Sequence, residues 1–280
     1  MTPQQIVDAI YAKAAAEGVG PPPHPSYRDT FKNGNPDTVV TGIATTGMST
    51  FDMLKRAVAE GRNFIISHED TWYSDNDSVE ALSGDPVYLA KKAFIDEHGL
   101  VIWRNHDLAH RMRPDPLFAG QLSLLGWEAD KPANGAAPRW PVVTLPQPMT
   151  LEALAAYVTR RTGTHAHRIT GPRDMMVRKV AIGVGYAFPD FTLDDDVDVI
   201  VGGEAAEGAD SHLPTYDATA FAQDSTLLGR PRGIILLGHM GTEDIGMKLL
   251  AEWLAGFIKD VSIRYIPANE PFTPLNARPG

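Results

Sequence analysis

Three pairs of histidine and carboxylate residues stand out, because each one closely follows an apolar run that is typical of a buried strand. The pairs are His68–Glu69 in FIISHED, His106–Asp107 in VIWRNHD and His239–Glu243 in GHMGTE. Imidazole and carboxylate groups are ligands of divalent metals, and the chain has no cysteine that could supply a thiolate instead. The residue types therefore predict a divalent-metal site.

The spacing within the pairs limits how they can bind. His239 and Glu243 are four residues apart, so on a helix both side chains lie on one face and can reach one ion. His68 and Glu69 are adjacent, so on a strand their side chains would point to opposite faces. They need a turn to share an ion, or they bind two different ions. Since an acid can bridge, a centre of two ions about 3.5–4 Å apart fits these residues.

The predicted elements place these residues at the ends of strands. The first helix is expected to begin at Thr2, with Gln5 closing a capping box. Strands are expected at residues 37–45, 63–67, 99–103, 178–183, 197–201, 233–237 and 261–266, and further helices at 49–61, 87–98, 150–161 and 243–258. This alternation predicts an α/β fold with parallel or mixed sheets and helices on the outside. Ligands of open α/β sheets bind at the carboxyl ends of the strands, where the three pairs lie.

Two stretches of the chain repeat. FIISHE (64–69) resembles VIVGGE (199–204), and GLVIWRNHD (99–107) resembles GIILLGHMG (233–241) at nearly the same offset. Two matches in order predict a duplicated α/β unit, in which Glu204 is the partner of Glu69. The segment 131–147 is rich in Pro, Ala and Gly. We therefore expect a first half at residues 1–147 and a second half at 148–280.

Charge and hydropathy narrow the class of protein. The net charge of −10 argues against a nucleic-acid backbone as the main partner, which would require a basic face. No apolar run approaches the ~20 residues of a membrane span, and the N-terminus lacks a signal-peptide pattern. We expect a cytoplasmic protein with a small-molecule substrate and no membrane partner. The alternative is a secreted form whose signal has been removed.

These motifs resemble the Nif-three-like family of dinuclear metal-centre proteins, also called GTP cyclohydrolase type two. The resemblance covers about residues 37–254 and depends on IISHED in place of IITHHP, an Asp after the next strand, and the late GHMGTE. It implies two related α/β halves with a metal cleft between them. It also implies a homo-oligomer, often a hexameric ring.

The resemblance implies a set of metal ligands in this chain. By position they are His68, Asp107, His239 and Glu243, and the second histidine of the family falls at Glu69. Glu69 can still ligate and bridge two ions. Because oxygen replaces imidazole there, the expected preference moves from zinc towards manganese, iron or magnesium. The expected cofactor is two divalent ions of manganese, iron or zinc.

The other histidines leave alternatives open. The family stretch HTNLD is replaced by WRNHDLAH, so His106 could ligate in place of Asp107 or beside it. His110 lies four residues further on, so the two histidines could reach the metal, support its ligands or line a helix face. His165 and His167 fall in a predicted loop and are expected to be exposed.

Three residues near the pairs are candidates for substrate binding. Trp72 and Tyr73 follow the His68–Glu69 pair and could form the wall of a pocket for a planar ring or pack in the core. Arg104 could hold a phosphate or carboxylate of the substrate, or neutralise the nearby acids.

Two classes of function follow. In the first, the protein is a metal-dependent hydrolase in which metal ions activate water and Glu69 or Glu204 transfers protons. The substrate class that the resemblance implies is a nucleotide or related heterocycle, opened at an amidine-like carbon, although a phosphoester would use the same groups. In the second, the protein binds metal or a protein partner without catalysis.

Overall fold

The structure is a computed structural model that describes the whole chain except residues 21–23, 132–138, 165–167, 194–195, 206–216 and 274–280. The chain forms two compact units, which are described separately. The first consists of Met1–Ala119 and Asp244–Ala268, and the second of Gly120–Glu243 and Asn269–Gly280. The division of the chain into halves at residue 147 remains a prediction. The first compact unit contains residues 244–268 in addition to the N-terminal part of the chain.

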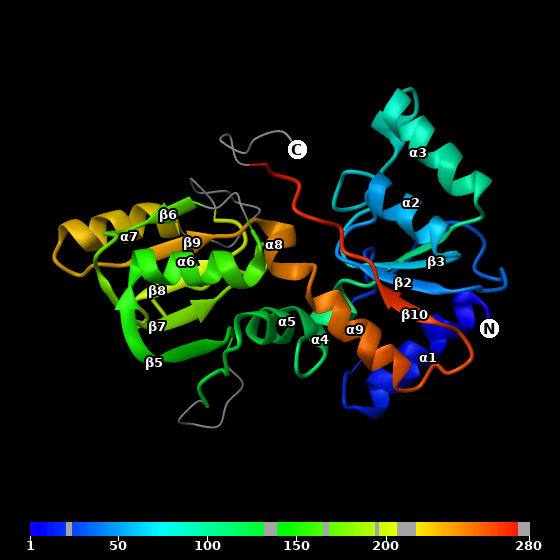
Figure 1. The fold of residues 1–280 in the computed structure, drawn as a ribbon. Coiled ribbons are helices and arrows are strands. Elements are labelled where there is room, and N and C mark those ends of the chain that lie inside the picture. The colour runs from blue at the N-terminus through cyan, green and yellow to red at the C-terminus, as the bar shows by residue number, and fades with distance from the viewer. Residues whose placement is uncertain (21–23, 132–138, 165–167, 194–195, 206–216, 274–280) are drawn as a thin grey trace. The chain divides into compact units, whose positions relative to one another are not determined.

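The first unit is built on a five-stranded sheet in the order β1-β4-β3-β2-β10 (Figure 1). Its strands are β1 (Phe31–Asn33), β2 (Ile43–Thr46), β3 (Phe64–Ser67), β4 (Val101–Arg104) and β10 (Ile263–Tyr265). Strands β10, β2, β3 and β4 are parallel, and β1 runs antiparallel to β4 at one edge. The carboxyl ends of β3 and β4 therefore lie side by side.

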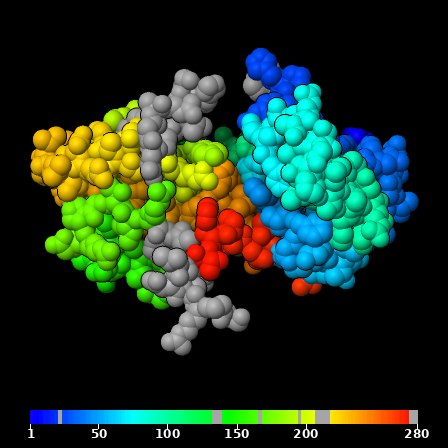
Figure 2. Space-filling model, turned by 90° about the horizontal axis from the view of Figure 1, so that it is seen from above, coloured from blue at the N-terminus to red at the C-terminus, as the bar shows by residue number. Residues whose placement is uncertain are grey.

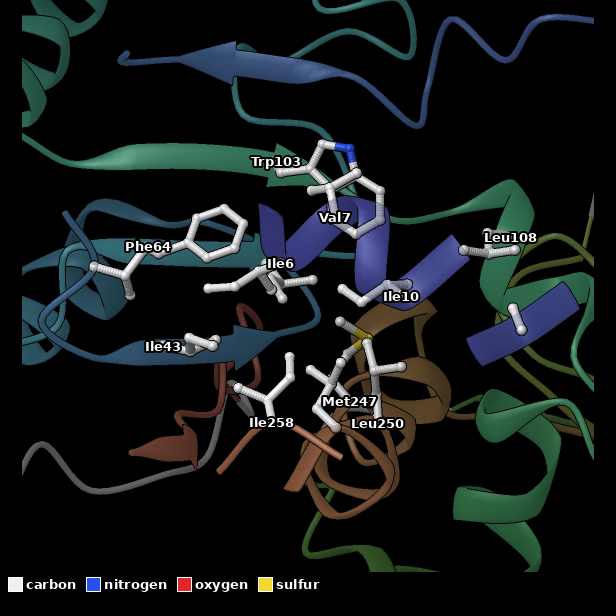
Figure 3. Close-up of a cluster of buried hydrophobic side chains, with 14 of the residues drawn as sticks. Ile6, Val7, Ile10, Ile43, Phe64, Trp103, Leu108, Met247, Leu250 and Ile258 are labelled. Carbon is white, nitrogen blue, oxygen red and sulfur yellow. The ribbon is translucent and has the colours of Figure 1, made fainter. Parts of the chain in front are cut away.

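Helices cover both faces of this sheet. They are α1 (Pro3–Ala16), α2 (Phe51–Ala59), the 3₁₀ turn η1 (Glu80–Leu82), α3 (Pro86–Glu97), α4 (Asp107–Arg111) and α9 (Gly246–Ala255), while α5 (Pro116–Leu125) contains the boundary between the units. Ile66 and Trp103 belong to a core cluster with α1 and α9 (Figure 3). Ile65 and Ile102 belong to a second cluster with α2 and α3. Because neighbouring strand residues point to opposite faces, these apolar runs bury both faces of the sheet.

The first helix confirms the capping prediction. The Gln5 N–H donates to Thr2 Oγ1 at 3.3 Å, and the Thr2 N–H donates to Gln5 Oε1 at 3.0 Å. Ile6 and Ile10, one helical turn apart, are both fully buried. Reciprocal capping satisfies N–H groups that the first turn of a helix would otherwise leave unpaired.

The second unit has a sheet of the same size in the order β5-β7-β8-β9-β6. Its elements are β5 (Val142–Thr150), α6 (Leu151–Thr162), β6 (Arg168–Thr170), β7 (Met176–Ile182), β8 (Val199–Gly202), α7 (Ala218–Leu227), β9 (Gly233–Leu236) and α8 (His239–Glu243). Helix α6 packs on β5 and β7, and α7 packs on β6 and β9. Figure 2 shows α7, in gold, at the surface of this unit and α3, in cyan, at the surface of the first.

The two units share a plan, as the internal repeat predicts. In the first sheet the parallel strands β2, β3 and β4 lie side by side, and the antiparallel edge strand β1 pairs with β4. In the second sheet β7, β8 and β9 are the parallel strands, and the antiparallel edge strand β6 pairs with β9. Phe64 pairs with Val101 in the first sheet, and Val199 pairs with Gly233 in the second. In this register Gly233 corresponds to Val101, whereas the sequence match placed it opposite Gly99, two residues earlier. With the register of the strands, the short helices α4 and α8 occupy equivalent positions. Asp107 and His239 are therefore the equivalent first residues of these helices.

Two sequence predictions about elements need correction. The strand expected at residues 37–45 is confined to Ile43–Thr46, and the side chain of Val39 is exposed. The segment 131–147, which was expected to separate the two halves, contains most of β5, an edge strand, in which Pro146 and Pro148 lie between paired segments. Proline is tolerated there because an edge strand has unpaired N–H positions. The closing helix and strand pack on the first sheet.

Among the residues that the structure describes, no helix is both long enough and apolar enough to cross a bilayer.

Candidate metal centre

A turn directly after β3 brings His68 and Glu69 to the same side of the chain. The N–H of His68 donates to the Thr46 carbonyl at 3.0 Å, and the N–H of Glu69 donates to the Gly47 carbonyl at 2.7 Å. Ser67 Oγ donates to the Glu69 carbonyl at 2.9 Å and tightens the turn. His68 Nε2 and Glu69 Oε1 are 3.9 Å apart, and both side chains are buried. The turn that the sequence required for a shared site is present.

Helix α4 places His106 and His110 beside His68. The carboxylate of Asp29 accepts hydrogen bonds from the N–H groups of His106, Asp107 and Leu108, at 2.7, 2.9 and 2.8 Å. It therefore caps the start of this five-residue helix from a distant part of the chain. The His106 and His110 rings lie 4.8 Å apart on the helix. No sequence signal pointed to Asp29, because the cap comes from outside the helix.

The three histidines form one cluster within the first unit. The His68 and His106 rings stack at 4.6 Å with an interplanar angle of 14°, and His110 meets His68 edge-on at 5.0 Å. One ligand atom from each of the three lies within 4.8 Å of the others, a spacing at which they could hold a metal ion. The strand end and the helix thus bring together residues that lie 42 positions apart in the sequence.

Each imidazole in the cluster faces an oxygen acceptor through Nδ1. The acceptors are the Asn105 carbonyl for His68 at 3.1 Å, Asp107 Oδ1 for His106 at 2.8 Å, and Asp115 Oδ2 for His110 at 3.0 Å. When Nδ1 donates, the lone pair of a neutral imidazole is on Nε2. Metal-binding histidines in proteins are held in this way. The arrangement therefore favours Nε2 as the metal-binding atom of all three.

Electrostatics favour the neutral form of the central histidine. Complete burial, followed by repulsion from His110 and His106, lowers the pKa of His68 well below its usual value. Hydrogen bonds from His106 and Ser26 hold the pKa of Asp107 below its usual range. A neutral imidazole keeps the lone pair that binds metal, and a charged Asp107 is a strong acceptor for His106.

Glu69 is part of a buried ion pair. Arg104 is fully buried, and its Nη2 donates to Glu69 Oε2 at 2.8 Å. Its Nε donates to the His68 carbonyl at 3.1 Å, and its Nη1 donates to the Asp75 carbonyl at 2.5 Å. The other carboxylate oxygen, Oε1, lies 3.5 Å from His106 Nε2. Burial of the guanidinium supports the predicted neutralising role of Arg104 over direct contact with a substrate.

The second unit places His239 and Glu243 together on α8. His239 Nε2 lies 2.9 Å from Glu243 Oε2, so their four-residue spacing puts both on one face as the sequence predicts. Glu204, after β8, has Oε1 3.7 Å from His239 Nδ1. The Tyr186 ring meets the imidazole edge-on at 4.9 Å. The structure thus groups Glu204 with His239 and Glu243, and groups His68, Glu69, Asp107, His106 and His110 in the first unit.

Gly185 lies against the His239–Glu243 pair, although no sequence motif pointed to it. It has φ +48°, and a Cβ there would lie 2.0 Å from Glu243 Oε1 and 2.7 Å from His239 Nε2. Its N–H donates to Thr242 Oγ1 at 3.0 Å. The glycines of GVG could have suggested a close approach of the backbone, but the functional partner lies far along the chain.

Gly185→Ala should therefore lower the free energy of unfolding of the second unit by more than the cost of placing an alanine at a positive φ angle. The left-handed conformation costs about 1–3 kcal/mol for a residue with a side chain, and the clash with His239 and Glu243 adds to this. Gly229→Ala is the matched control, because Gly229 has φ +83° and nothing within 4 Å of its Cβ position. Denaturant unfolding measures both variants. Equal losses of unfolding free energy in the two variants would show that His239 and Glu243 do not clash with a side chain at position 185.

Trp72 and Tyr73 differ in their exposure to solvent. Trp72 is buried, and its Nε1 donates to the Lys32 carbonyl at 3.2 Å. Tyr73 is 55% exposed at φ +66°. Lys91 Nζ lies over both rings, at 5.5 and 4.9 Å, and donates to the Thr71 carbonyl at 2.6 Å. The Trp72 side chain is thus buried in a core cluster, and it also lines a cavity of the first unit.

Burial lowers the pKa of Lys91 from 10.5 to about 8. Between these values the unfolded chain binds one proton more than the folded chain, so the free energy of unfolding should rise with pH, by up to about 3 kcal/mol. Lys91→Met should remove this rise. Lys92→Met, at an exposed neighbour, should keep it. Urea unfolding at pH 7.5, 9 and 10 measures the slope, and identical slopes in the two variants would contradict the assignment.

The chain matches the model of the Duf34/NIF3 (NGG1p interacting factor 3) family over residues 31–271. The chain belongs to this family. No curated relative matches it. Membership confirms the family that the strand-end motifs resemble, and the two-sheet α/β fold is that of solved NIF3 structures.

Three solved structures share the fold of this NIF3-family chain. Protein ybgI, of unknown function, is 20% identical with a TM-score of 0.67, over 97% of this chain and 100% of that one. A Bacillus cereus protein related to NIF3 is 15% identical with a TM-score of 0.69, over 98% and 99%. Reduced HcgD from Methanocaldococcus jannaschii is 17% identical with a TM-score of 0.63, over 95% and 98%.

His165 and His167 lie outside the residues that the structure describes.

Proposed function

We propose that this protein is a metal-dependent hydrolase whose first unit holds a divalent ion through Nε2 of His68, His106 and His110. The observation that carries the proposal is the set of three Nδ1 contacts to oxygen acceptors, the arrangement in which proteins hold histidines that bind metal through Nε2. His106 then ligates, and Asp107 orients it. This assignment chooses between the two roles that the sequence left open for these residues.

The donor set fits a metal of borderline softness. Three imidazoles favour zinc, iron, copper or nickel over magnesium. Glu69 in place of the family's second histidine moved the expected preference towards manganese, iron or magnesium, but His106 and His110 restore nitrogen donors in this chain. We therefore propose zinc or iron for this cluster. His239 and Glu243 remain proposed ligands in the second unit, which keeps the expected total at two ions.

A bound divalent ion supplies a water of lowered pKa and an electrophile for the developing negative charge. The protein groups would manage position and protons. Glu69 is fixed by Arg104 through Oε2 and presents Oε1 to the cluster, so we propose it as the proton acceptor. Glu204 is the proposed counterpart beside His239. The proposed substrate is a nucleotide or related heterocycle, as the resemblance to GTP cyclohydrolase implies.

Turnover by the metal-loaded protein tests this proposal. Zinc-loaded or iron-loaded protein should hydrolyse at least one member of a panel of GTP, other nucleotides and phosphoesters, and a chelator should abolish the reaction. Glu69→Gln should keep its metal and lose about 100-fold or more in kcat. Glu60→Gln, at a partly exposed position, is the control. Full metal content without turnover on any substrate would favour the non-catalytic alternative.

We also propose a cytoplasmic homo-oligomer, with the hexamer that the family resemblance implies. Light scattering would then give about six times the chain mass of 30.4 kDa.

A further inference from the structure

A cavity of about 400 Å³ lies in the first unit, apart from the three histidines. Small-molecule sites usually have about 300–1,000 Å³ and combine aromatic walls with a few polar groups. Four aromatic side chains line this one, namely Tyr27, Phe31, Trp72 and Tyr88. None of the proposed metal ligands lines it. The cavity is therefore a candidate for a ligand of its own.

The aromatic wall is held in place by its surroundings. The Trp72 ring meets the Tyr88 ring edge-on at 5.0 Å, and Trp72 Nε1 donates to the Lys32 carbonyl. Tyr27 is half exposed, and its hydroxyl donates to Asp75 at 2.5 Å. Rings fixed in this way lose little entropy on binding, so they favour a flat, rigid partner.

The charges inside the cavity neutralise one another. Lys32 Nζ lies 3.1 Å from Asp77 Oδ2, and both side chains are at least 95% buried. Asp77 Oδ1 also accepts the N–H groups of Thr71 and Trp72, at 2.7 and 2.9 Å. This pair fixes the loop that carries Trp72 and adds no net charge to the wall.

One lysine that lines the cavity can exchange its ion-pair partner for a ligand. Lys92 is 40% exposed, and its only ion pair among the described residues is an i,i+4 contact of 2.5 Å with Asp96. Such exposed pairs contribute about 0.3–0.5 kcal/mol, so a ligand anion can replace Asp96 at little cost. Asn76 Oδ1 accepts hydrogen bonds from Ser74 and Ser78, which leaves its amide N–H groups to donate to a ligand.

We propose that this cavity binds a small planar aromatic ring that carries an anionic group. The ring packs on Tyr27 and Trp72, and the anion pairs with Lys92 and accepts a hydrogen bond from the Asn76 amide. The proposal goes beyond the hydrolase function and does not require metal. Arg104 links the two regions, because it lies 3.7 Å from Asp77 and 2.8 Å from Glu69.

Indole-3-acetate is the probe, titrated by two-dimensional NMR into metal-free full-length protein. The indole N–H signal of Trp72, assigned with Trp72→Phe, should shift in a saturable way, with a Kd of about 1 mM or below. Cyclohexylacetate, which lacks the ring, and indole-3-acetamide, which lacks the charge, should each bind more weakly. Tyr27→Leu should weaken indole-3-acetate about tenfold through loss of ring contact, and Lys92→Gln several-fold.

Lys55→Gln is the matched control, because Lys55 is a helix lysine that lies over an aromatic ring, that of Phe51, and does not line the cavity. It should leave the Kd unchanged. Three outcomes would overturn the proposal: no saturable shift of the Trp72 signal, equal binding of cyclohexylacetate, or Lys92→Gln and Tyr27→Leu affinities equal to wild type. Each readout uses metal-free protein, so failure here is distinct from failure of the hydrolase proposal.

Discussion

His68→Ala should raise the Kd of the first unit's metal by more than about 100-fold, since loss of a supporting contact alone costs 10–100-fold. His68 is fully buried at the end of β3, stacks on His106, and is kept neutral by its surroundings. No other described imidazole can replace it at that strand end. Competition with a chelating dye for zinc measures the Kd on purified wild-type and variant protein.

His98→Ala is the matched control for this experiment. His98 lies at the end of α3, with its Nδ1 bonded to the Phe94 carbonyl, and it belongs to no metal-binding group found in the described residues. Its Kd should equal that of wild type. The Kd of Asp115→Asn should lie between those of wild type and His68→Ala, because His110 loses a charged hydrogen-bond acceptor but keeps its imidazole ring. An unchanged Kd in a folded His68→Ala protein would refute the three-histidine site.

Arg104→Met should lower the free energy of unfolding of the first unit by about 3–5 kcal/mol, because it leaves a buried carboxylate without its counter-charge. The partner is Glu69, which is 7% exposed and receives the Arg104 Nη2 at 2.8 Å. Two backbone carbonyls, of His68 and Asp75, also lose their donor. Urea unfolding followed by circular dichroism measures the change.

Removing both partners should recover part of this loss. In Arg104→Met/Glu69→Leu the buried charge is gone, so the double variant should be more stable than Arg104→Met alone. Arg264→Met is the surface control. Arg264 is 64% exposed and pairs with Glu60 at 3.4 Å, so its loss should cost less than about 1 kcal/mol. Equal losses in Arg104→Met and Arg264→Met would show that the Glu69 carboxylate is not held by Arg104.

The position of His68 and His106 after buried strands was predictable from the sequence. The apolar runs before His68 and His106 are buried on both faces, and such runs mark central parallel strands. Parallel neighbours end at the same edge, so the sequence placed these two histidines together. The four-residue spacing of His239 and Glu243 likewise predicted their shared face.

The contacts that the three imidazoles make through Nδ1 were not predictable. Asp29 caps α4 from 77 residues away, and only the fold brings it there. Asp115 precedes Pro116, a pattern that predicts a helix start, and its Oδ1 accepts the Leu117 N–H at 2.8 Å. Its second oxygen accepts from His110, which no local pattern indicates.

Strand partners are also set by tertiary structure. The apolar residues of β10 and α9 fit either sheet by pattern, but they pack on β2 and the first core cluster. The prolines of β5 argued against a strand, although they are compatible with the edge that β5 occupies. Which strand becomes an edge depends on the order of the whole sheet, which a single segment does not encode.

The most direct test of the proposed centre is an anomalous difference map from crystals of zinc-loaded protein, with data collected at the zinc edge. We expect a peak about 2.0–2.1 Å from Nε2 of His68, His106 and His110, with the three Nδ1 atoms still bonded to Asn105, Asp107 and Asp115. A peak bound by Asp107 without His106, or zinc peaks only at other residues, would contradict it.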